Sequence, residues 1–137
     1  MPPMGENAEL ARRVLVADDI HLNQVVFTQM LKRWNIHADT ANNGLEAVSM
    51  CSQVVYEAVF MDCHMPQLDG FEATRKIRQL EGYREVPVVA LTAATSEEDQ
   101  AACQQCGMTH FLAKPVTLAT LRAMLAQVSL IPSDGSP

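Results

Sequence analysis

Five short apolar segments alternate with helix-length segments along the chain, and this alternation constrains the fold more than any other feature. The strand-like segments are rich in Val, Ile, Phe or Leu, and they are Arg13–Ala17, Ile36–Thr40, Ala58–Met61, Val86–Leu91 and His110–Leu112. The first, third and fourth are almost continuously apolar, as expected for strands covered on both faces. Strand–helix units at this spacing predict parallel strands joined by right-handed crossovers. We therefore expect an α/β fold with a doubly wound, five-stranded parallel sheet in the strand order 2-1-3-4-5.

The intervening segments carry helical signals. Four of the five expected helices are marked by residues at helical spacing, in chain order Leu22, Val25, Val26 and Met30; Leu45 and Val48; Phe71, Thr74 and Ile77; and Leu118, Leu121, Leu125 and Val128. The turn at residues 42–44 opens the second helix, and Phe71, Thr74 and Ile77 are expected to face inward on the third. Ser96 and the acidic residues after it predict the N-terminus of the fourth helix, and Gly107 predicts its end.

The length and composition describe one domain of ordinary size. A chain of 137 residues with 48% hydrophobic residues can form a single core. The net charge of −6 provides no basic surface, so direct binding of nucleic acid is not expected. No apolar run approaches the roughly 18 residues of a membrane span, and the N-terminus does not resemble a signal peptide. We expect a cytoplasmic domain that makes no contact with a membrane.

The two ends of the chain differ from its middle. Residues 1–11 and 131–137 are rich in Pro, Gly, Ser and acidic residues and show no periodicity. We interpret them as a flexible N-terminal linker and a flexible C-terminal tail. One folded domain is then expected at residues 12–130.

Cys103 and Cys106 have the C-x-x-C spacing that occurs in zinc sites and in thiol redox sites. A zinc site would need two more soft ligands at matching spacing, and none follow in the sequence. The pair also lies at the end of an expected helix rather than between a strand and a helix. We therefore predict that these cysteines are reduced and structural.

Acidic residues follow two of the expected strands, where ligands of open α/β sheets bind. Asp18 and Asp19 end the first strand, and Asp62 ends the third. In the expected strand order these two strands are neighbours, so the three carboxylates converge at one edge of the sheet. Carboxylate oxygens suit Mg²⁺, which would offset their mutual repulsion. A structural alternative is that Asp19 caps the helix that starts near His21.

The last two strands also end in residues that suit an anionic ligand. Thr92 offers a hydroxyl group for a phosphoryl oxygen, and the small side chain of Ala93 leaves room for a ligand. Lys114 would neutralise negative charge at the same edge. Pro115 follows it and permits a cis peptide bond.

These features together resemble the receiver domain of two-component response regulators. The resemblance covers about residues 13–129. It depends on four motifs in order at compatible spacing, which are Val16-Ala17-Asp18-Asp19, the segment Met61-Asp62-Cys63-His64-Met65-Pro66-Gln67-Leu68-Asp69-Gly70, Ala90-Leu91-Thr92-Ala93 and Phe111-Leu112-Ala113-Lys114-Pro115. The segments 19–23 and 107–111 are similar to those of receivers in hybrid sensor histidine kinases. The resemblance to receiver domains implies a flavodoxin-like (βα)5 fold.

The resemblance implies that Asp62 takes a phosphoryl group and forms an aspartyl phosphate. Asp19, Asp62 and the backbone carbonyl of His64 would hold Mg²⁺, with Asp18 acting partly through water. The resemblance implies that Thr92, Ala93 and Lys114, which follow or end the other strands at this edge, bind the phosphoryl oxygens. Positioning and charge neutralisation are what phosphoryl transfer needs most.

The resemblance also implies a switch and a partner. Phe111 would follow the movement of Thr92, and the output face would lie on the fourth helix, fifth strand and fifth helix. Separately from the resemblance, His64 follows Asp62 by two residues, so we expect its side chain to tune the lifetime of the phosphoryl group. None of the four histidines lies in a kinase-like helix, so the donor is a histidine kinase or histidine phosphotransfer domain acting in trans. A dimer of receivers, and a parent chain that is a membrane-bound hybrid histidine kinase, remain open.

Other classes of protein share parts of this pattern. A phosphatase of the haloacid-dehalogenase type also uses an aspartate at a strand end, but it needs a second aspartate where this chain has His64. A nucleotide-binding module such as a flavodoxin-like protein needs a glycine-rich or phosphate-binding loop after the first strand, and Asp18-Asp19-Ile20-His21 stands there. A pseudo-receiver that keeps the fold without phosphorylation is the third alternative. We expect no catalysis by this domain beyond its own phosphorylation and dephosphorylation.

Overall fold

A computed structural model describes residues 12–93 and 97–132. The strands form one parallel sheet in the order β2-β1-β3-β4-β5, which confirms the predicted topology. Their bounds are Arg12–Ala17 for β1, Ile36–Ala41 for β2, Val59–Asp62 for β3, Val88–Thr92 for β4 and His110–Ala113 for β5. The predicted linker, most of the predicted tail and the Ser96 cap lie outside the described residues.

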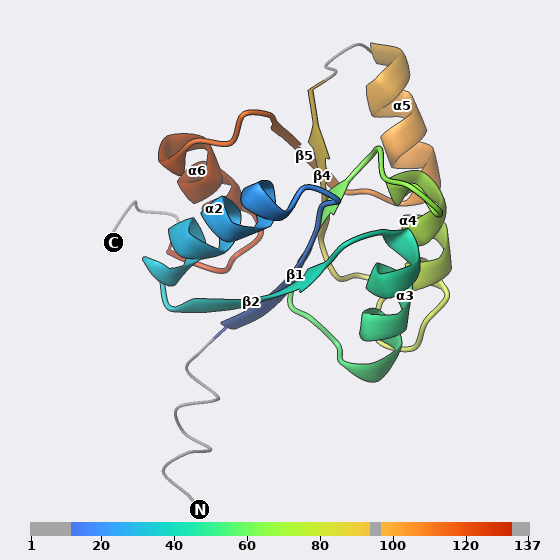
Figure 1. The fold of residues 1–137 in the computed structure, drawn as a ribbon, viewed down its shortest axis with the longest axis horizontal. Helices are drawn as coiled ribbons and strands as arrows, with labels where there is room; N and C mark the ends of the chain where they lie inside the picture. Colours follow the sequence, from blue (N-terminus) through green and yellow to red (C-terminus); the bar gives the residue numbers. More distant parts are fainter. Residues whose placement is uncertain (1–11, 94–96, 133–137) are drawn as a thin grey trace, which may run out of the picture.

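Helices cover both faces of the sheet (Figure 1). The helices α2 (His21–Lys32) and α6 (Leu118–Gln127) cover one face, and α3 (Gly44–Gln53), α4 (Gly70–Arg78) and α5 (Glu97–Cys106) cover the other. Successive residues of each strand point to opposite faces, so Val14 and Val16 of β1 join one core while Leu15 and Ala17 join the other. Two apolar layers therefore hold the strand ends in place.

The apolar stripe predicted for α2 is not its buried face. Leu22, Val25 and Val26 are 68%, 39% and 48% exposed, whereas Phe27 and Leu31 are buried. The ring of Phe27 lies 5.0 Å from that of Phe60 in β3. Because α2 carries apolar residues on two faces, its periodicity alone does not reveal which of them the sheet covers.

The other helices agree with their predicted positions. Gly107 follows α5 with a φ of +109°, as expected for a residue that ends a helix. Thr74 and Ile77 of α4 are buried and Phe71 is half-buried. Leu45 and Leu118 remain exposed, so helix positions were predicted better than the inward side of each helix. No helix in the described ranges has the length and apolar character to cross a membrane.

Candidate phosphoryl-transfer site

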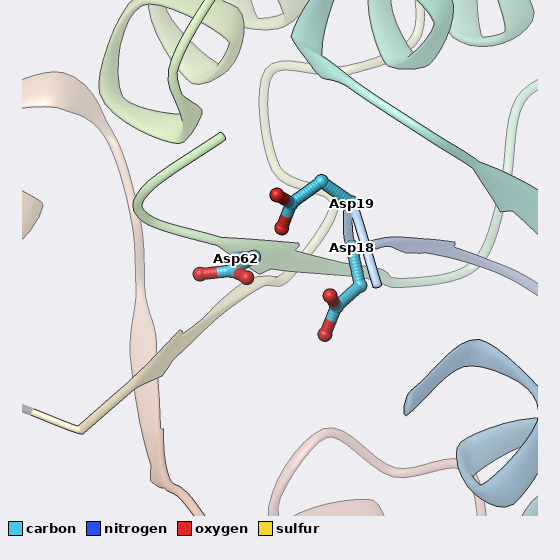
Figure 2. Close-up of side chains that lie close together, drawn as sticks. All are labelled: Asp18, Asp19 and Asp62. Atoms are coloured by element: carbon cyan, nitrogen blue, oxygen red, sulfur yellow. The ribbon is translucent and has the colours of Figure 1, made fainter. Parts of the chain in front are cut away.

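Three carboxylates meet at the C-terminal edge of the sheet (Figure 2). Asp62 is the last residue of β3, and Asp18 and Asp19 directly follow β1. One oxygen from each of the three lies within 4.8 Å of the others. Asp18 and Asp62 are 2% and 6% exposed, while Asp19 faces solvent. The convergence expected from the strand order is therefore confirmed.

Asp18 is held by the start of α2. Its Oδ1 accepts a hydrogen bond of 2.9 Å from the backbone N–H of Ile20, and Nδ2 of Asn23 lies 3.3 Å from its Oδ2. The cap position of α2 is occupied by Ile20, and no side-chain hydrogen bond caps the helix. The alternative role of Asp19 as a helix cap is therefore wrong. Its carboxylate is left to face the cluster.

Lys114 is the cationic group of the site. Its Nζ donates to Oδ2 of Asp62 at 2.9 Å and lies 3.6 Å from Oδ2 of Asp18. Burial by itself would lower the pKa of Lys114, but the hydrogen bond from Lys114 to Asp62 and the attraction of both carboxylates outweigh it and raise the pKa. The lysine therefore stays charged near neutral pH. The single positive charge of Lys114 only partly offsets the charges of the three carboxylates.

The backbone packs tightly around Asp62. A Cβ atom added to Gly70 would lie 2.2 Å from the carbonyl oxygen of Asp62, so only glycine fits at this position. The N–H of Gly70 donates to the carbonyl of Cys63 at 3.0 Å, and the N–H of His64 donates to Oδ1 of Asp62 at 3.2 Å. These contacts fix both the main chain and one carboxylate oxygen of Asp62.

Thr92, Ala93 and Lys114 lie at the same edge as the acids. Thr92 ends β4 and pairs with Ala113 of β5, and the N–H of Lys114 donates to the Thr92 carbonyl at 3.0 Å. Ala93 and Lys114 line a common groove with Asp18. The Lys114–Pro115 peptide bond is cis, as the sequence permits. The predicted residues from four strand ends thus come together.

Two predicted residues lie to the side of the acid cluster. The ring of His64 is exposed and packs edge-on against Phe71, with 6.0 Å between the ring centroids. Phe111 in β5 is half-buried and packs against the core beneath α3, α4 and α5. Both remain predictions as functional residues. The position of His64 at the edge of the sheet is compatible with a tuning role. The position of Phe111 on the face covered by α3, α4 and α5 is compatible with a switching role.

The cysteines are reduced and buried in the core, which confirms the prediction that they are structural. All four thiols are buried and none forms a disulfide, and the Sγ of Cys103 lies 3.9 Å from that of Cys63. The thiol of Cys106 donates to the Cys103 carbonyl. Burial, with smaller effects from Cys103 and Asp62, raises the pKa of Cys63. These thiols behave as small apolar residues of the core.

Two polar residues at the start of α2, Asn23 and Gln24, contact Asp18 although the sequence pattern assigned them no role. Asn23 contacts the Asp18 carboxylate, and Gln24 contacts the Asp18 carbonyl at 2.6 Å. Both lie in the first turn of the helix, five and six residues after the acid. Two adjacent polar side chains in the helical turn that follows Asp18 and Asp19 are the sequence signal that could have indicated these contacts.

The three carboxylates fit a hard divalent cation. All of their contacting atoms are oxygen, and the charge of Lys114 leaves the site acidic. Mg²⁺ prefers a few carboxylates together with water. The donor set is therefore chemically suited to Mg²⁺ and unsuited to a soft metal.

Comparison with known proteins identifies the family. The family model for the response regulator receiver domain matches residues 14–126. The hybrid signal transduction histidine kinase E of Dictyostelium discoideum is 41% identical over an alignment of 118 residues, and the match covers 83% of this chain and 7% of that protein. The chain therefore belongs to the receiver domains of two-component phosphorelay signalling, and it spans only a small part of the hybrid kinases it matches.

Solved structures agree with this assignment. The receiver domain of the sensor histidine kinase PA1611 from Pseudomonas aeruginosa, with a magnesium ion coordinated in its active site cleft, is 37% identical with a TM-score of 0.81. That match covers 87% of this chain and 98% of that one. The receiver domain of Ssk1 from Saccharomyces cerevisiae, in complex with the histidine phosphotransfer protein Ypd1, is 29% identical with a TM-score of 0.81, over 90% and 92% of the two chains.

Proposed function

We propose that Asp62 is the phosphoacceptor of this receiver and that residues 12–130 form the receiver unit. The supporting observation is the buried Asp62 carboxylate at the end of β3, bonded to Lys114 and gathered with Asp18 and Asp19. A carboxylate oxygen of Asp62 attacks the phosphorus of a partner's phosphohistidine. The P–O bond forms as the P–N bond breaks, and the imidazole of the donor leaves with the electron pair of that bond.

Mg²⁺ is the cofactor we propose for this step. Asp19, Asp62 and the carbonyl of His64 would hold it, with Asp18 acting partly through water. When bound, the cation supplies positive charge that neutralises the transferring phosphoryl group. The ammonium of Lys114 moves its hydrogen bond from Asp62 to a phosphoryl oxygen, and Thr92 with the backbone at Ala93 binds further phosphoryl oxygens.

The exposed apolar face of α2 supports a donor that acts in trans. Leu22 and Val26 line a groove of about 480 Å³ that also reaches Asp18 and Lys114. Exposed apolar patches beside a reactive group are typical of protein interaction sites. We infer that a histidine kinase or histidine phosphotransfer domain covers this face while its phosphohistidine reaches Asp62.

The output and the lifetime of the signal involve other residues. We propose that phosphorylation draws Thr92 toward the phosphoryl group and that Phe111 changes its packing in response. This biases the surface of α5, β5 and α6 between two arrangements. His64, two residues after Asp62, would border the path of the hydrolytic water and so tune the rate of dephosphorylation.

The phosphoacceptor assignment is tested with acetyl phosphate, a small donor that needs no docking surface. With Mg²⁺, intact-mass measurement should show one added phosphoryl group on the wild-type chain and none on Asp62→Asn. Asp69→Asn is the matched control, because Asn can still cap α4 as Asp69 does. It should be labelled like the wild type. Undiminished labelling of Asp62→Asn would disprove the assignment.

A further inference from the structure

A buried glutamine joins the ends of β1 and β2 beside the acid cluster. The Nε2 atom of Gln24 donates to the carbonyl oxygen of Asp18 at 2.6 Å and to Oδ1 of Asn42 at 2.9 Å, and it lies 3.3 Å from the carbonyl of Ala41. Gln24 is 3% exposed. Two of its partners are main-chain carbonyl oxygens, which only accept hydrogen bonds, so this position requires a side-chain donor.

The connection continues to the loop that follows Asp62. After Asn42, the N–H of Gly44 donates to the carbonyl of Leu68 at 3.0 Å, and a Cβ atom on Gly44 would lie 2.1 Å from that oxygen. The turn between β2 and α3 is thus fastened to Gln24 on one side and to the loop after β3 on the other. The loops that carry Asp18 and Asp62 share this link.

We propose that Gln24 is a positioning residue of the Mg²⁺ site. It touches neither the acids' carboxylate oxygens nor the transferring group. It holds the main chain of Asp18, and through Asn42 it sets the distance between the loops after β1 and β3. Groups that orient metal ligands in this way usually change metal affinity when they are removed. The inference rests on the proposed function, because it concerns the same cation.

Gln24→Met tests the inference, because methionine keeps the length of the side chain and removes the amide donor. Titration of Mg²⁺, followed by calorimetry or by backbone amide shifts, should show roughly tenfold weaker binding than in the wild type. Labelling by acetyl phosphate at saturating Mg²⁺ should reach the wild-type level. Asn42→Ala removes one partner of Gln24 and should weaken Mg²⁺ binding in the same direction, by less.

Tyr83→Phe is the control for a merely structural role. Tyr83 is fully buried at the opposite edge of the sheet, where its hydroxyl donates to the carbonyl of Val54 and accepts from the N–H of Tyr56. Loss of this hydroxyl should lower the thermal midpoint of unfolding, as we also expect for Gln24→Met, while Mg²⁺ affinity should stay unchanged.

Each outcome decides between the alternatives. Wild-type Mg²⁺ affinity in Gln24→Met, or an equal loss in Tyr83→Phe, overturns the positioning role. If Gln24→Met does not fold, wild-type affinity in Asn42→Ala overturns it instead, and weakened affinity supports it. A wild-type chain that fails to bind Mg²⁺ refutes the cofactor of the proposed function, which is a separate result.

Discussion

Lys114 lies between two buried carboxylates, so the charge balance of the site depends on this residue. In the cation-free state its ammonium partly offsets the charges of Asp18 and Asp62, with Nζ–O distances of 3.6 and 2.9 Å. The same ammonium repels a divalent cation at the site. Lys114 therefore has two opposed effects, one on Mg²⁺ binding and one on phosphoryl transfer.

Lys114→Met should separate these two effects. Mg²⁺ affinity should rise by roughly tenfold, because a neighbouring positive charge is lost. Phosphorylation by acetyl phosphate should slow by roughly a hundredfold, because one group that neutralises phosphoryl charge is lost. Calorimetry measures the first quantity, and the time course of labelling measures the second.

Lys32→Met is the matched control for this substitution. It removes the same charge from an exposed position at the end of α2 and should leave both quantities unchanged. Weaker Mg²⁺ binding by Lys114→Met would contradict the repulsion argument.

At the scale of elements, hydrogen bonds at Asp39 join β1, β2 and the segment before β3. Its carboxylate in β2 accepts from Arg13 in β1 at 3.0 and 3.2 Å, from Tyr56 before β3 at 2.7 Å, and lies 3.0 Å from Nε2 of His37. Burial would raise the pKa of Asp39, but the hydrogen bonds from Tyr56, Arg13 and His37 outweigh it and hold the pKa below the usual 3.8. The ionised carboxylate therefore stabilises the contact of β2 with β1.

Asp39→Asn should make the stability less dependent on pH. Because the folded-state pKa of Asp39 is depressed, its contribution is present above about pH 3.8 and is lost as the pH falls through the folded pKa. At pH 7 the variant should lose about 1 kcal/mol of unfolding free energy. Near pH 3 the difference should shrink, and urea unfolding at both pH values measures it.

Glu57→Gln provides the comparison for Asp39→Asn. Glu57 forms an ion pair with Arg12 at the surface, where the Glu57 side chain is 40% exposed and that of Arg12 is 48% exposed. Such pairs contribute little to stability. A loss in Asp39→Asn that is no larger than in Glu57→Gln, or that stays constant down to pH 3, would contradict the role assigned to Asp39.

At the scale of the whole molecule, the acids and the proposed output surface lie on connected elements. Thr92 ends β4 and Lys114 directly follows β5, and the next helices along the chain are α5 and α6. These helices cover opposite faces of the sheet (Figure 1). A change at the strand ends can therefore reach both faces through short connections.

Beryllofluoride with Mg²⁺ mimics the phosphoryl group and should reveal this connection. Amide chemical shifts should change along α5, β5 and the first half of α6 as well as in the loops around Asp19 and Asp62. Asp62→Asn should show no such changes, and α3 should be little affected in either protein. Changes confined to the loops around the acids would show binding without transmission and would refute the switch.

The sequence by itself determined the order of elements, the parallel sheet and the edge at which Asp18, Asp19, Asp62, Thr92 and Lys114 meet. This was possible because strand–helix alternation with right-handed crossovers permits few topologies, and the strand ends then follow. Only the tertiary structure decided which face of α2 is buried, since Leu22 and Phe27 lie on different apolar faces of one helix. It alone also showed the amide of Gln24 on the Asp18 carbonyl. Such contacts depend on packing across elements, which periodicity along one element does not encode.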